Sequence, residues 1–450
     1  MRITMIGCGY AGLTTSVALA YVGHRVHCID QSEDWIKSLQ NGNIPFYETG
    51  VKELLVEVND RLSFGNWESF DNQTDVIILA VGTPRKGNGD VDLTSVEAVA
   101  RELGRRLSGD TLPVIVIKST VPVGSTRRVQ SIISHCLRNR NIYTPVKGAS
   151  NPEFLREGMA LFDTFYPDRI VVGASDDAVK ILREIYAPIL EQTFIPPEFI
   201  PRPDDFAMPA FIVTTPTSAE LIKYAANAFL AMKISYINEI AGLAERVGAD
   251  IREVARGVGL DKRIGPQFLN AGAGWGGSCF GKDIQALIHT AGQYGYEMPL
   301  CSAAVLVNKR MREEVIKKLQ AVIKVIRGSA IGLLGLSFKP GTDDLRDAPS
   351  ITIASRLIEL GAHVKVYDPV AMDNCRKNHP DLDVEYAAGA EELANGTDAL
   401  VLVTEWEEFI TLPFIRLGER MRQKIMIDGR NVLNAEELAD MGFIYLCIGC

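Results

Sequence analysis

Apolar and polar positions at the start of the chain predict a strand, a turn, a helix and a second strand. Residues 2–6 form a short apolar run, residues 13–22 have the composition of a buried helix, and residues 25–29 form another apolar run closed by Asp30. The apolar runs at 76–81 and 114–118 predict further strands, because strands of a parallel sheet are buried on both faces. The first third of the chain therefore predicts a parallel α/β domain.

The last third of the chain repeats this pattern. Apolar strands are predicted at 329–336, 361–368, 398–404 and 424–428, with a helix at 351–360. The repeat predicts a second α/β unit, which lacks the glycine-rich turn of the first.

The middle of the chain has a different character. Residues 194–216 contain six prolines and predict an extended connector, because proline disfavours helix interiors and central strands. Helical spacing then predicts long helices at 218–247 and 300–326, with residues 310–314 of the second on a solvated face. We predict an α/β fold in which two Rossmann-like doubly wound domains are joined by a central helical domain with a long helix. The expected boundaries are 1–205, 206–310 and 311–450.

Composition narrows the class of function. The chain has 450 residues with 47% hydrophobic and 23% charged residues, as in ordinary globular proteins, and its net charge is −9. Nucleic acids and anionic membranes bind basic surfaces, so we expect neither as a partner. Because no apolar run approaches the ~20 residues that span a bilayer and the start of the chain lacks a signal-peptide pattern, we expect a cytoplasmic protein.

The eight cysteines are scattered along the chain, which favours thiols over a disulfide framework. Cys447 and Cys450 form a CxxC pair, but no second pair of ligands accompanies it, and we expect two thiols there as well. The six histidines show no ligand spacing with the cysteines, so we predict no metal.

The turn after the first strand carries a dinucleotide-binding fingerprint. Gly7-Cys8-Gly9-Tyr10-Ala11-Gly12 lies between the predicted strand and helix, where its backbone amides can approach a pyrophosphate. Asp30 at the end of the second strand is expected to bind a ribose 2′-hydroxyl and to repel a 2′-phosphate, which favours NAD over NADP. Thr83 and Thr120 follow two later strands, at the edge where ligands of parallel sheets bind, although either could be an ordinary helix cap.

Residues 272–283 carry the strongest indication of chemistry. Four glycines precede Cys279, and Gly281, Lys282 and Asp283 follow it closely. Glycines in such number are entropically costly, so the segment favours close approach of backbone to a ligand. A thiol beside an NAD site could capture an aldehyde as a hemithioacetal, from which hydride removal gives a thioester. The alternative is a small, buried cysteine.

The chain resembles the UDP-glucose/GDP-mannose dehydrogenase family over essentially its whole length, and most closely the branch that oxidises UDP-glucose. The resemblance rests on the fingerprint and on residues 81–84, 119–126, 151–158, 219–227, 276–283, 338–346 and 428–430, in this order. It implies a four-electron oxidation of UDP-glucose to UDP-glucuronate with two NAD and one water. It also implies a homodimer or higher homo-oligomer, formed through the central helices.

The resemblance assigns roles to individual residues. It implies a nucleophilic Cys279, a carboxylate at Glu153 for acid/base work and thioester hydrolysis, and an oxyanion-stabilising pair, Lys223 and Asn227. Asp283 would support the lysine and an ordered water, with Thr120 nearby. The implied cofactor-binding residues are Gly7, Gly9, Tyr10, Ala11, Gly12, Asp30, Thr83, Thr120, Glu157 and Arg346. The implied substrate-binding residues are Phe154, Leu155, Lys223, Asn227, Arg263, Phe268, Leu269, Gly276, Phe338, Lys339 and Arg430, with Arg263 reaching the neighbouring subunit.

One position departs from the family pattern, and three other functions remain open. Relatives usually carry a lysine where this chain has Trp35, which removes a second expected ribose contact. The nearest alternative is a dehydrogenase of another nucleotide sugar: GDP-mannose, a UDP-N-acetylhexosamine or UDP-galactose. A two-electron 3-hydroxyacid or ketopantoate-type reductase would need neither Cys279 nor the second α/β unit. A non-catalytic nucleotide-sugar binding protein would not need the set of reactive residues.

Overall fold

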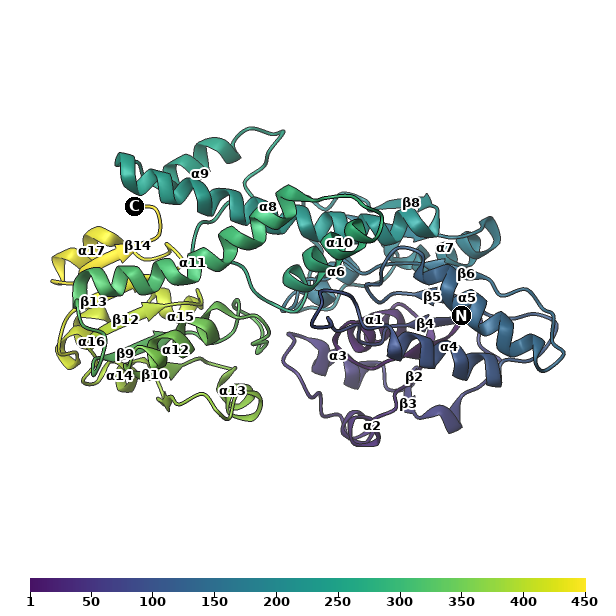
Figure 1. Ribbon diagram of the computed structural model, residues 1–450. Coiled ribbons are helices and arrows are strands. Elements are labelled where there is room, and N and C mark those ends of the chain that lie inside the picture. The colour runs from purple at the N-terminus through teal and green to yellow at the C-terminus, as the bar shows by residue number, and fades with distance from the viewer. The chain divides into compact units, whose positions relative to one another are not determined.

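The computed structural model describes residues 1–450, which divide into two compact units. The first unit contains residues 1–226 and 285–294, and the second contains residues 227–284 and 295–450. Each unit is built on one sheet, and Figure 1 labels the elements of both. No helix in the fold combines the length and apolar character that crossing a bilayer requires.

The sheet of the first unit has the strand order β3-β2-β1-β4-β5-β6-β7-β8. Its strands are β1 (Arg2–Ile6), β2 (Arg25–Ile29), β3 (Leu62–Gly65), β4 (Val76–Leu79), β5 (Val114–Ile117), β6 (Gly148–Ser150), β7 (Arg169–Gly173) and β8 (Ala210–Thr214). All neighbours pair in parallel except β6 and β7. The order reverses between β1 and β4, so ligands are expected at the carboxyl ends of these two strands.

Helices cover both faces of this sheet. They are α1 (Tyr10–Tyr21), α2 (Glu33–Gln40), α3 (Val51–Glu57), η1 (Trp67–Ser69), α4 (Thr94–Arg106), α5 (Ser125–Arg138), α6 (Ala160–Phe165) and α7 (Asp176–Leu190). One hydrophobic core lies under α1, α3, α6 and α7, and a separate core lies under α4 and α5. The first unit is therefore doubly wound, as predicted from the apolar runs.

The second unit contains a six-stranded parallel sheet of the same topology, in the order β11-β10-β9-β12-β13-β14. Its strands are β9 (Ala330–Leu334), β10 (His363–Tyr367), β11 (Glu385–Tyr386), β12 (Ala399–Leu402), β13 (Ile425–Asp428) and β14 (Ile444–Cys447). The helices after β9 are α12 (Pro349–Glu359), α13 (Met372–Asn378), α14 (Ala390–Ala394), α15 (Glu407–Ile410), α16 (Phe414–Arg420) and α17 (Ala435–Asp440). The repeat predicted from the sequence is confirmed, and so is the expected fold class.

The helical middle of the chain consists of α8 (Pro216–Val247), α9 (Ile251–Gly259), α10 (Phe280–Gln293) and α11 (Pro299–Ile323). The 32-residue α8 is the predicted long helix. It begins in the first unit and ends in the second. Parts of α8, α9 and α11 bury apolar side chains in the core on one face of the second sheet.

Two expectations need correction. Residues 194–216, predicted to be a connector, contain the edge strand β8, because the stretch Ala210–Thr214 between two prolines is itself proline-free and rich in β-forming residues. Cys447 and Cys450, expected to be thiols, form a disulfide with their Cα atoms 5.9 Å apart. A turn with Gly449 at φ +86° brings the two cysteines within the range that a disulfide can bridge.

Candidate functional site

The turn between β1 and α1 has the shape of a phosphate cradle. A side chain at Gly12 would overlap the carbonyl of Gly7, so the helix approaches the strand as closely as only glycine permits. A Cβ on Gly9, in contrast, would meet nothing within 4 Å. The protein's own packing does not require a glycine at position 9, and the open space beside the helix start suits a pyrophosphate. The residues present therefore fit the dinucleotide expected there.

Asp30 lies directly after β2 and is held beside this turn. Its Oδ2 accepts a hydrogen bond from the Cys8 amide at 2.8 Å, and its Oδ1 accepts one from the Ser32 amide at 3.0 Å. The carboxylate is partly exposed, so it retains acceptor capacity toward a ribose hydroxyl.

Trp35 on α2 occupies the position at which the family resemblance led us to expect a lysine. Its indole Nε1 donates to the Cys8 carbonyl at 2.9 Å, and its ring stacks on Phe46 with centroids 6.4 Å apart. The Trp35 side chain thus supports the fingerprint turn through a hydrogen bond to its backbone. The sequence did not predict this role.

Tyr10, the first residue of α1, is tied to a distant loop. Its hydroxyl donates to the buried carboxylate of Glu48, which also accepts from the amides of Gly158 at 2.6 Å and Ala160 at 2.7 Å. Burial, followed by the charge of Glu48, raises the pKa of Tyr10. Glu48 therefore couples the fingerprint to the loop after β6. Sequence reasoning missed Glu48, which belongs to no recognisable motif.

Thr83 and Thr120 meet at the carboxyl edge of the sheet. The Thr83 hydroxyl donates to the Thr120 carbonyl at 2.8 Å, so the turns after β4 and β5 are joined. The loop after β6, which carries Glu153 and Glu157, follows the next strand along this edge.

Glu153 and Lys223 form a buried ion pair in the first unit. Glu153 Oε1 lies 3.1 Å from Lys223 Nζ, with the two side chains 13% and 4% exposed, and Glu153 Oε2 accepts from the Leu155 amide at 2.7 Å. Burial raises the pKa of the Glu153 carboxyl, but Lys223, the Leu155 amide and Lys118 outweigh this effect, and the pKa lies below its usual value. The carboxylate is therefore ionised and able to act as a base.

Two cations lie close to the Phe154 ring. Arg169 Cζ lies 4.0 Å and Lys223 Nζ lies 5.3 Å from the ring centroid. Phe154 and Leu155, both expected to contact substrate, thus help to place the Glu153–Lys223 pair.

Lys118 is a buried cation that sequence reasoning did not select. It is 7% exposed and follows β5, with Nζ 3.4 Å from the Tyr186 hydroxyl and 3.5 Å from Asn151 Oδ1. Asn151 immediately precedes the Pro152-Glu153 turn. A signal was available in the sequence, because a lysine directly after an apolar strand marks a charge at the functional edge of the sheet.

Glu220 anchors the start of α8, one turn before Lys223. Its buried carboxylate accepts from the Gly124 amide at 2.6 Å, the Thr126 amide at 2.8 Å and the Thr126 hydroxyl at 2.6 Å. These donors belong to the N-terminus of α5, which favours negative charge. Burial nevertheless raises the pKa of Glu220. The contacts hold α8 in register with the sheet edge that carries Glu153.

In the second unit, Cys279 immediately precedes α10. Its carbonyl accepts from the Asp283 amide at 2.8 Å, and its half-buried Sγ lies 3.3 Å from Ser278 Oγ. The positive end of the α10 dipole favours negative charge at this position. The glycine segment before it is fixed by the Gly277 amide, which donates to the Arg346 carbonyl at 2.8 Å.

Asp283 is fully buried on the first turn of α10 and holds two side chains. Asn227 Nδ2 donates to its Oδ2 at 2.6 Å, and Lys282 Nζ lies 2.6 Å from its Oδ1. The expectation was that Asp283 supports Lys223 and an ordered water, whereas the cation paired with it here is Lys282. The structure brings Asn227 and Lys282 together at Asp283, on the first turn of the helix that follows Cys279.

Arg430 and Phe338 pack against the glycine segment. Arg430 donates to the carbonyls of Gly274 at 3.3 Å, Phe338 at 3.1 Å and Val403 at 2.6 Å. A Cβ on Gly276 would lie 2.5 Å from the Asp347 carbonyl oxygen and 3.1 Å from the Phe338 Cβ, which explains the glycine there. Three of the predicted substrate residues therefore meet at one place, and Lys339 lies over the Phe338 ring.

The remaining predicted residues are distributed through the second unit. Arg263 is 89% exposed and paired with Asp261 at 2.6 Å, and Arg346 is paired with Asp344 at 2.7 Å. The Phe268 ring packs against Phe280, and Leu269 is buried.

Arg312 corrects the expectation that residues 310–314 lie on a solvated face. It is 9% exposed and donates to the carbonyl of Trp275 at 3.1 Å and to Asp347 Oδ1 at 2.8 Å. The helical period does not reveal this role, because an arginine can bury its charge wherever carbonyls and carboxylates face it. No group of three or more His, Cys, Asp or Glu side chains is arranged to hold a metal ion.

Comparison with known proteins matches the chain to three domains of one family. Residues 1–190 match the NAD binding domain, residues 217–310 the central domain and residues 332–435 the UDP binding domain of the UDP-glucose/GDP-mannose dehydrogenase family. The UDP-glucose 6-dehydrogenase of Rhizobium meliloti strain 1021 is 44% identical over 458 residues, covering 100% of this chain and 99% of its own length. TuaD, a UDP-glucose 6-dehydrogenase of Bacillus subtilis strain 168, is 43% identical over 452 residues, covering 100% of this chain and 93% of its own.

Solved structures show the same relationship. A UDP-glucose dehydrogenase from Pyrobaculum islandicum superposes with a TM-score of 0.87 at 37% identity, covering 100% of this chain and 97% of that chain. A UDP-D-ManNAc dehydrogenase from Pyrococcus horikoshii superposes with a TM-score of 0.84 at 26% identity. The superposition covers 100% of this chain and 99% of that chain. The resemblance inferred from the motifs is confirmed: the chain belongs to the UDP-glucose/GDP-mannose dehydrogenase family.

Proposed function

We propose that this protein is an NAD-dependent UDP-glucose 6-dehydrogenase that converts UDP-glucose to UDP-glucuronate and reduces two NAD per sugar. The observation that carries the proposal is the position of Cys279 before α10, next to the buried Asp283–Asn227 pair. A two-electron dehydrogenase needs no such nucleophile, whereas a four-electron oxidation needs one to hold the aldehyde stage. The names of the full-length relatives support the choice of UDP-glucose.

The chemistry requires two oxidations and one hydrolysis. The first oxidation converts the C6 alcohol to an aldehyde, with loss of a hydride to the cofactor and a proton to solvent. The Cys279 thiolate adds to the aldehyde carbon, and oxidation of the resulting thiohemiacetal gives a thioester. Water then cleaves the C–S bond, which forms the carboxylate and returns the thiolate.

The proposed catalytic residues serve the charge and proton demands of these steps. Glu153, ionised beside Lys223, would accept a proton from the hydrolytic water. Lys223 and Asn227 would donate hydrogen bonds to the oxyanions, and Asp283 orients the Asn227 amide. Thr120 completes the proposed set at the edge of the first sheet.

NAD supplies the hydride acceptor when it is bound. Gly7, Gly9, Ala11 and Gly12 shape the turn for its pyrophosphate, and Asp30 presents an acceptor for a ribose hydroxyl. Tyr10, Thr83, Thr120, Glu157 and Arg346 complete the proposed cofactor-binding set.

The UDP moiety is proposed to bind in the second unit. Cations suit its diphosphate, and Lys339 and Arg430 lie beside the Phe338 ring and the glycine segment. Phe154, Leu155, Lys223, Asn227, Arg263, Phe268, Leu269, Gly276 and Phe338 complete the proposed substrate set. We retain 1–205, 206–310 and 311–450 as the proposed cofactor, helical and UDP-sugar domains.

A homodimer is proposed from an apolar stripe on α8. Phe229, Tyr236 and Leu243 follow one another at intervals of seven residues and are 59%, 54% and 57% exposed. Large apolar side chains spaced by heptads form helix–helix seams, and a second copy of α8 would cover them. Tyr236→Lys should shift the mass measured by light scattering toward that of the monomer. A cytoplasmic location is also proposed, and fractionation of the producing cells would test it.

The proposed activity is tested by counting NADH formed per sugar. With limiting UDP-glucose, two NADH and one UDP-glucuronate are expected, and one NADH per sugar would refute the thioester route. GDP-mannose, UDP-galactose and UDP-N-acetylhexosamines belong in the same panel, because a dehydrogenase of a UDP-N-acetylhexosamine shares this fold. Turnover of one of these sugars without turnover of UDP-glucose would overturn the choice of substrate.

A further inference from the structure

The Cys447–Cys450 disulfide closes a two-residue loop at the end of β14. Cys447 is 4% exposed, whereas Cys450 is exposed, so one sulfur of the bond is buried and the other belongs to an accessible residue. The other six cysteines of the chain are reduced. A reductant would therefore reach the bond from the side of Cys450.

Gly449, one of the two residues inside the loop, is hydrogen-bonded to α8 and α9. The Gly449 amide donates to Glu245 Oε1 at 2.7 Å, and the Gly449 carbonyl accepts from the Ile251 amide at 2.9 Å. Ile251 is the first residue of α9, so this carbonyl satisfies an amide that has no partner within its own helix. A side chain at Gly449 would lie 2.7 Å from the Ala241 Cβ. The loop docks only in a closely defined conformation.

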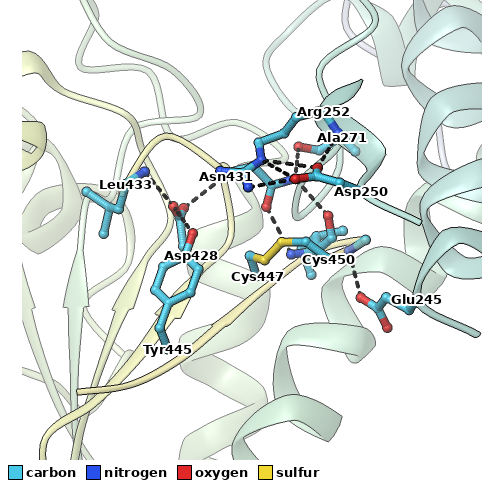
Figure 2. Close-up of a disulfide and its surroundings, with 12 residues drawn as sticks. Glu245, Asp250, Arg252, Ala271, Asp428, Asn431, Leu433, Tyr445, Cys447 and Cys450 are labelled. Carbon is cyan, nitrogen blue, oxygen red and sulfur yellow. Dashed lines mark hydrogen bonds and ion pairs between the residues drawn. A yellow bond between two sulfur atoms is a disulfide. The ribbon is translucent and has the colours of Figure 1, made fainter. Parts of the chain in front are cut away.

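The side chain of Asn431 is hydrogen-bonded to the backbone of this loop (Figure 2). Its Nδ2 donates to the Ile448 carbonyl at 2.7 Å, and its Oδ1 accepts from the Ile448 amide at 2.9 Å. The same Nδ2 lies 3.2 Å from the Ala271 carbonyl at the start of the glycine segment. Asn431 adopts φ +59°, a conformation that needs support from its surroundings.

The residue beside Asn431 belongs to the proposed UDP-sugar site. Arg430 holds the carbonyls of Gly274 and Phe338, and Asp428 Oδ1 accepts from the amides of both Arg430 and Asn431. A continuous series of hydrogen bonds therefore runs from the disulfide loop through Asn431 and Arg430 to the segment that carries Cys279.

We propose that Cys447 and Cys450 form a reversible thiol–disulfide modification site, whose state controls how firmly Asn431 and Arg430 are held and thereby the affinity for the UDP moiety. The second part rests on the proposed function of Arg430. Reduction requires a dithiol: its thiolate bonds to Cys450 Sγ, the S–S bond breaks, and Cys447 leaves as a thiolate. The second thiol of the reductant then displaces Cys450. The reductant becomes a disulfide, and two electrons and two protons reach the two cysteines.

Reduction should weaken the docking of Ile448 and Gly449, because the chain without the disulfide samples more conformations before it docks. The disulfide restricts Ile448 and Gly449 before they dock, and without it both residues must be ordered at the expense of chain entropy. The undocked population rises, and Asn431 loses both bonds to Ile448 in that population. Binding of the UDP moiety then has to restore the order of residues 430–431, which lowers its affinity.

The test uses the full-length protein, oxidised in air or reduced with dithiothreitol. Thiol titration after denaturation should find six thiols in the oxidised form and eight in the reduced form. Reduction should weaken UDP binding by about threefold to tenfold in calorimetry and leave NAD binding unchanged. Hydrogen exchange should accelerate at residues 430–433 and 448–449 in the reduced form.

Cysteine variants separate the effect of reducing Cys447 and Cys450 from any effect of dithiothreitol on the other cysteines. A Cys447→Ser/Cys450→Ser double variant should match the reduced protein and ignore dithiothreitol, whereas Cys136→Ser should respond like the parent. Eight thiols in the oxidised protein, or equal hydrogen exchange in the two forms, would overturn the proposal. If UDP binds to neither the oxidised nor the reduced form, the assignment of Arg430 to the UDP site is wrong. Hydrogen exchange at residue 431 then still shows whether the state of the disulfide controls the order of this segment.

Discussion

The Trp35 indole nitrogen donates a hydrogen bond to the carbonyl of Cys8, with 2.9 Å between the two atoms. Cys8 lies inside the fingerprint turn, and its amide binds Asp30, so both polar groups of this peptide residue are held by side chains. Trp35 therefore supports the turn itself, at a position where we had expected a lysine in contact with a ribose.

Trp35→Phe should weaken NAD binding by about fivefold, because it removes one partly buried hydrogen bond worth ~1 kcal/mol and leaves the ring stacking on Phe46. UDP binding and kcat at saturating NAD should not change. Titration of NAD followed by protein fluorescence measures the effect. Trp67→Phe, a change in another half-buried tryptophan of the first unit, serves as the control. Equal NAD affinity in the parent and Trp35→Phe would show that the indole bond does not support the cofactor site.

Cys279→Ala should lower formation of UDP-glucuronate by at least about 10³-fold, because no thioester can form without the sulfur. The fold and the binding of NAD and UDP should be retained, since the change removes one half-buried atom. Product analysis with calorimetry of both ligands provides the measurement, and Cys136→Ala is the matched control. Acid formation at the parent rate would exclude Cys279 as the nucleophile.

The sequence could predict those parts of the fold that rest on local patterns. A fully apolar strand such as Val114–Ile117 is recognisable because both of its faces are buried in a parallel sheet. The edge strand β8 is not, because none of its residues is buried and two prolines flank it. Its pairing with β7 depends on the tertiary fold.

The candidate site shows the same division. Cys279 and Asp30 stand in motifs whose spacing implies their chemistry. Glu48 and Lys118 act on groups more than 60 residues away, the Gly158 amide and the Tyr186 hydroxyl, and no local pattern records such partners. The disulfide escaped prediction for a similar reason, since the approach of Cys450 to Cys447 depends on a turn that is docked on Asn431.

Lys118→Met should move the acidic limb of the kcat profile to higher pH. The Lys118 ammonium lowers the pKa of Glu153, together with the stronger contribution of Lys223, and its removal raises that pKa. Glu153 then becomes protonated at a higher pH than in the parent, and the loss of kcat grows as the pH falls below about 5. The other groups around Lys118 are the Tyr186 hydroxyl and the Asn151 amide.

Lys118→Arg retains the charge and should restore most of the parent profile. Lys180→Met, which removes an exposed lysine from α7, should leave the profile unchanged. A uniform loss of kcat at every pH in Lys118→Met, with no displacement of the acidic limb, would mean that Lys118 supports only the fold.

Glu153→Gln should lower the free energy of unfolding by about 3 kcal/mol at neutral pH, because it removes the negative charge that faces the buried Lys223. The pKa of Glu153 in the fold lies below its ordinary value of 4.5. The ionised pair therefore stabilises the protein fully above that value, and this contribution disappears as the pH falls through the lower pKa of the folded state. The difference in unfolding free energy between parent and variant should stay constant from pH 8 to pH 5 and narrow only in more acidic solution. Urea denaturation across this range measures it, with the exposed Glu198→Gln as the control. A difference that already narrows between pH 7 and pH 6 would place the pKa of Glu153 above its ordinary value and would contradict its assignment as an ionised base.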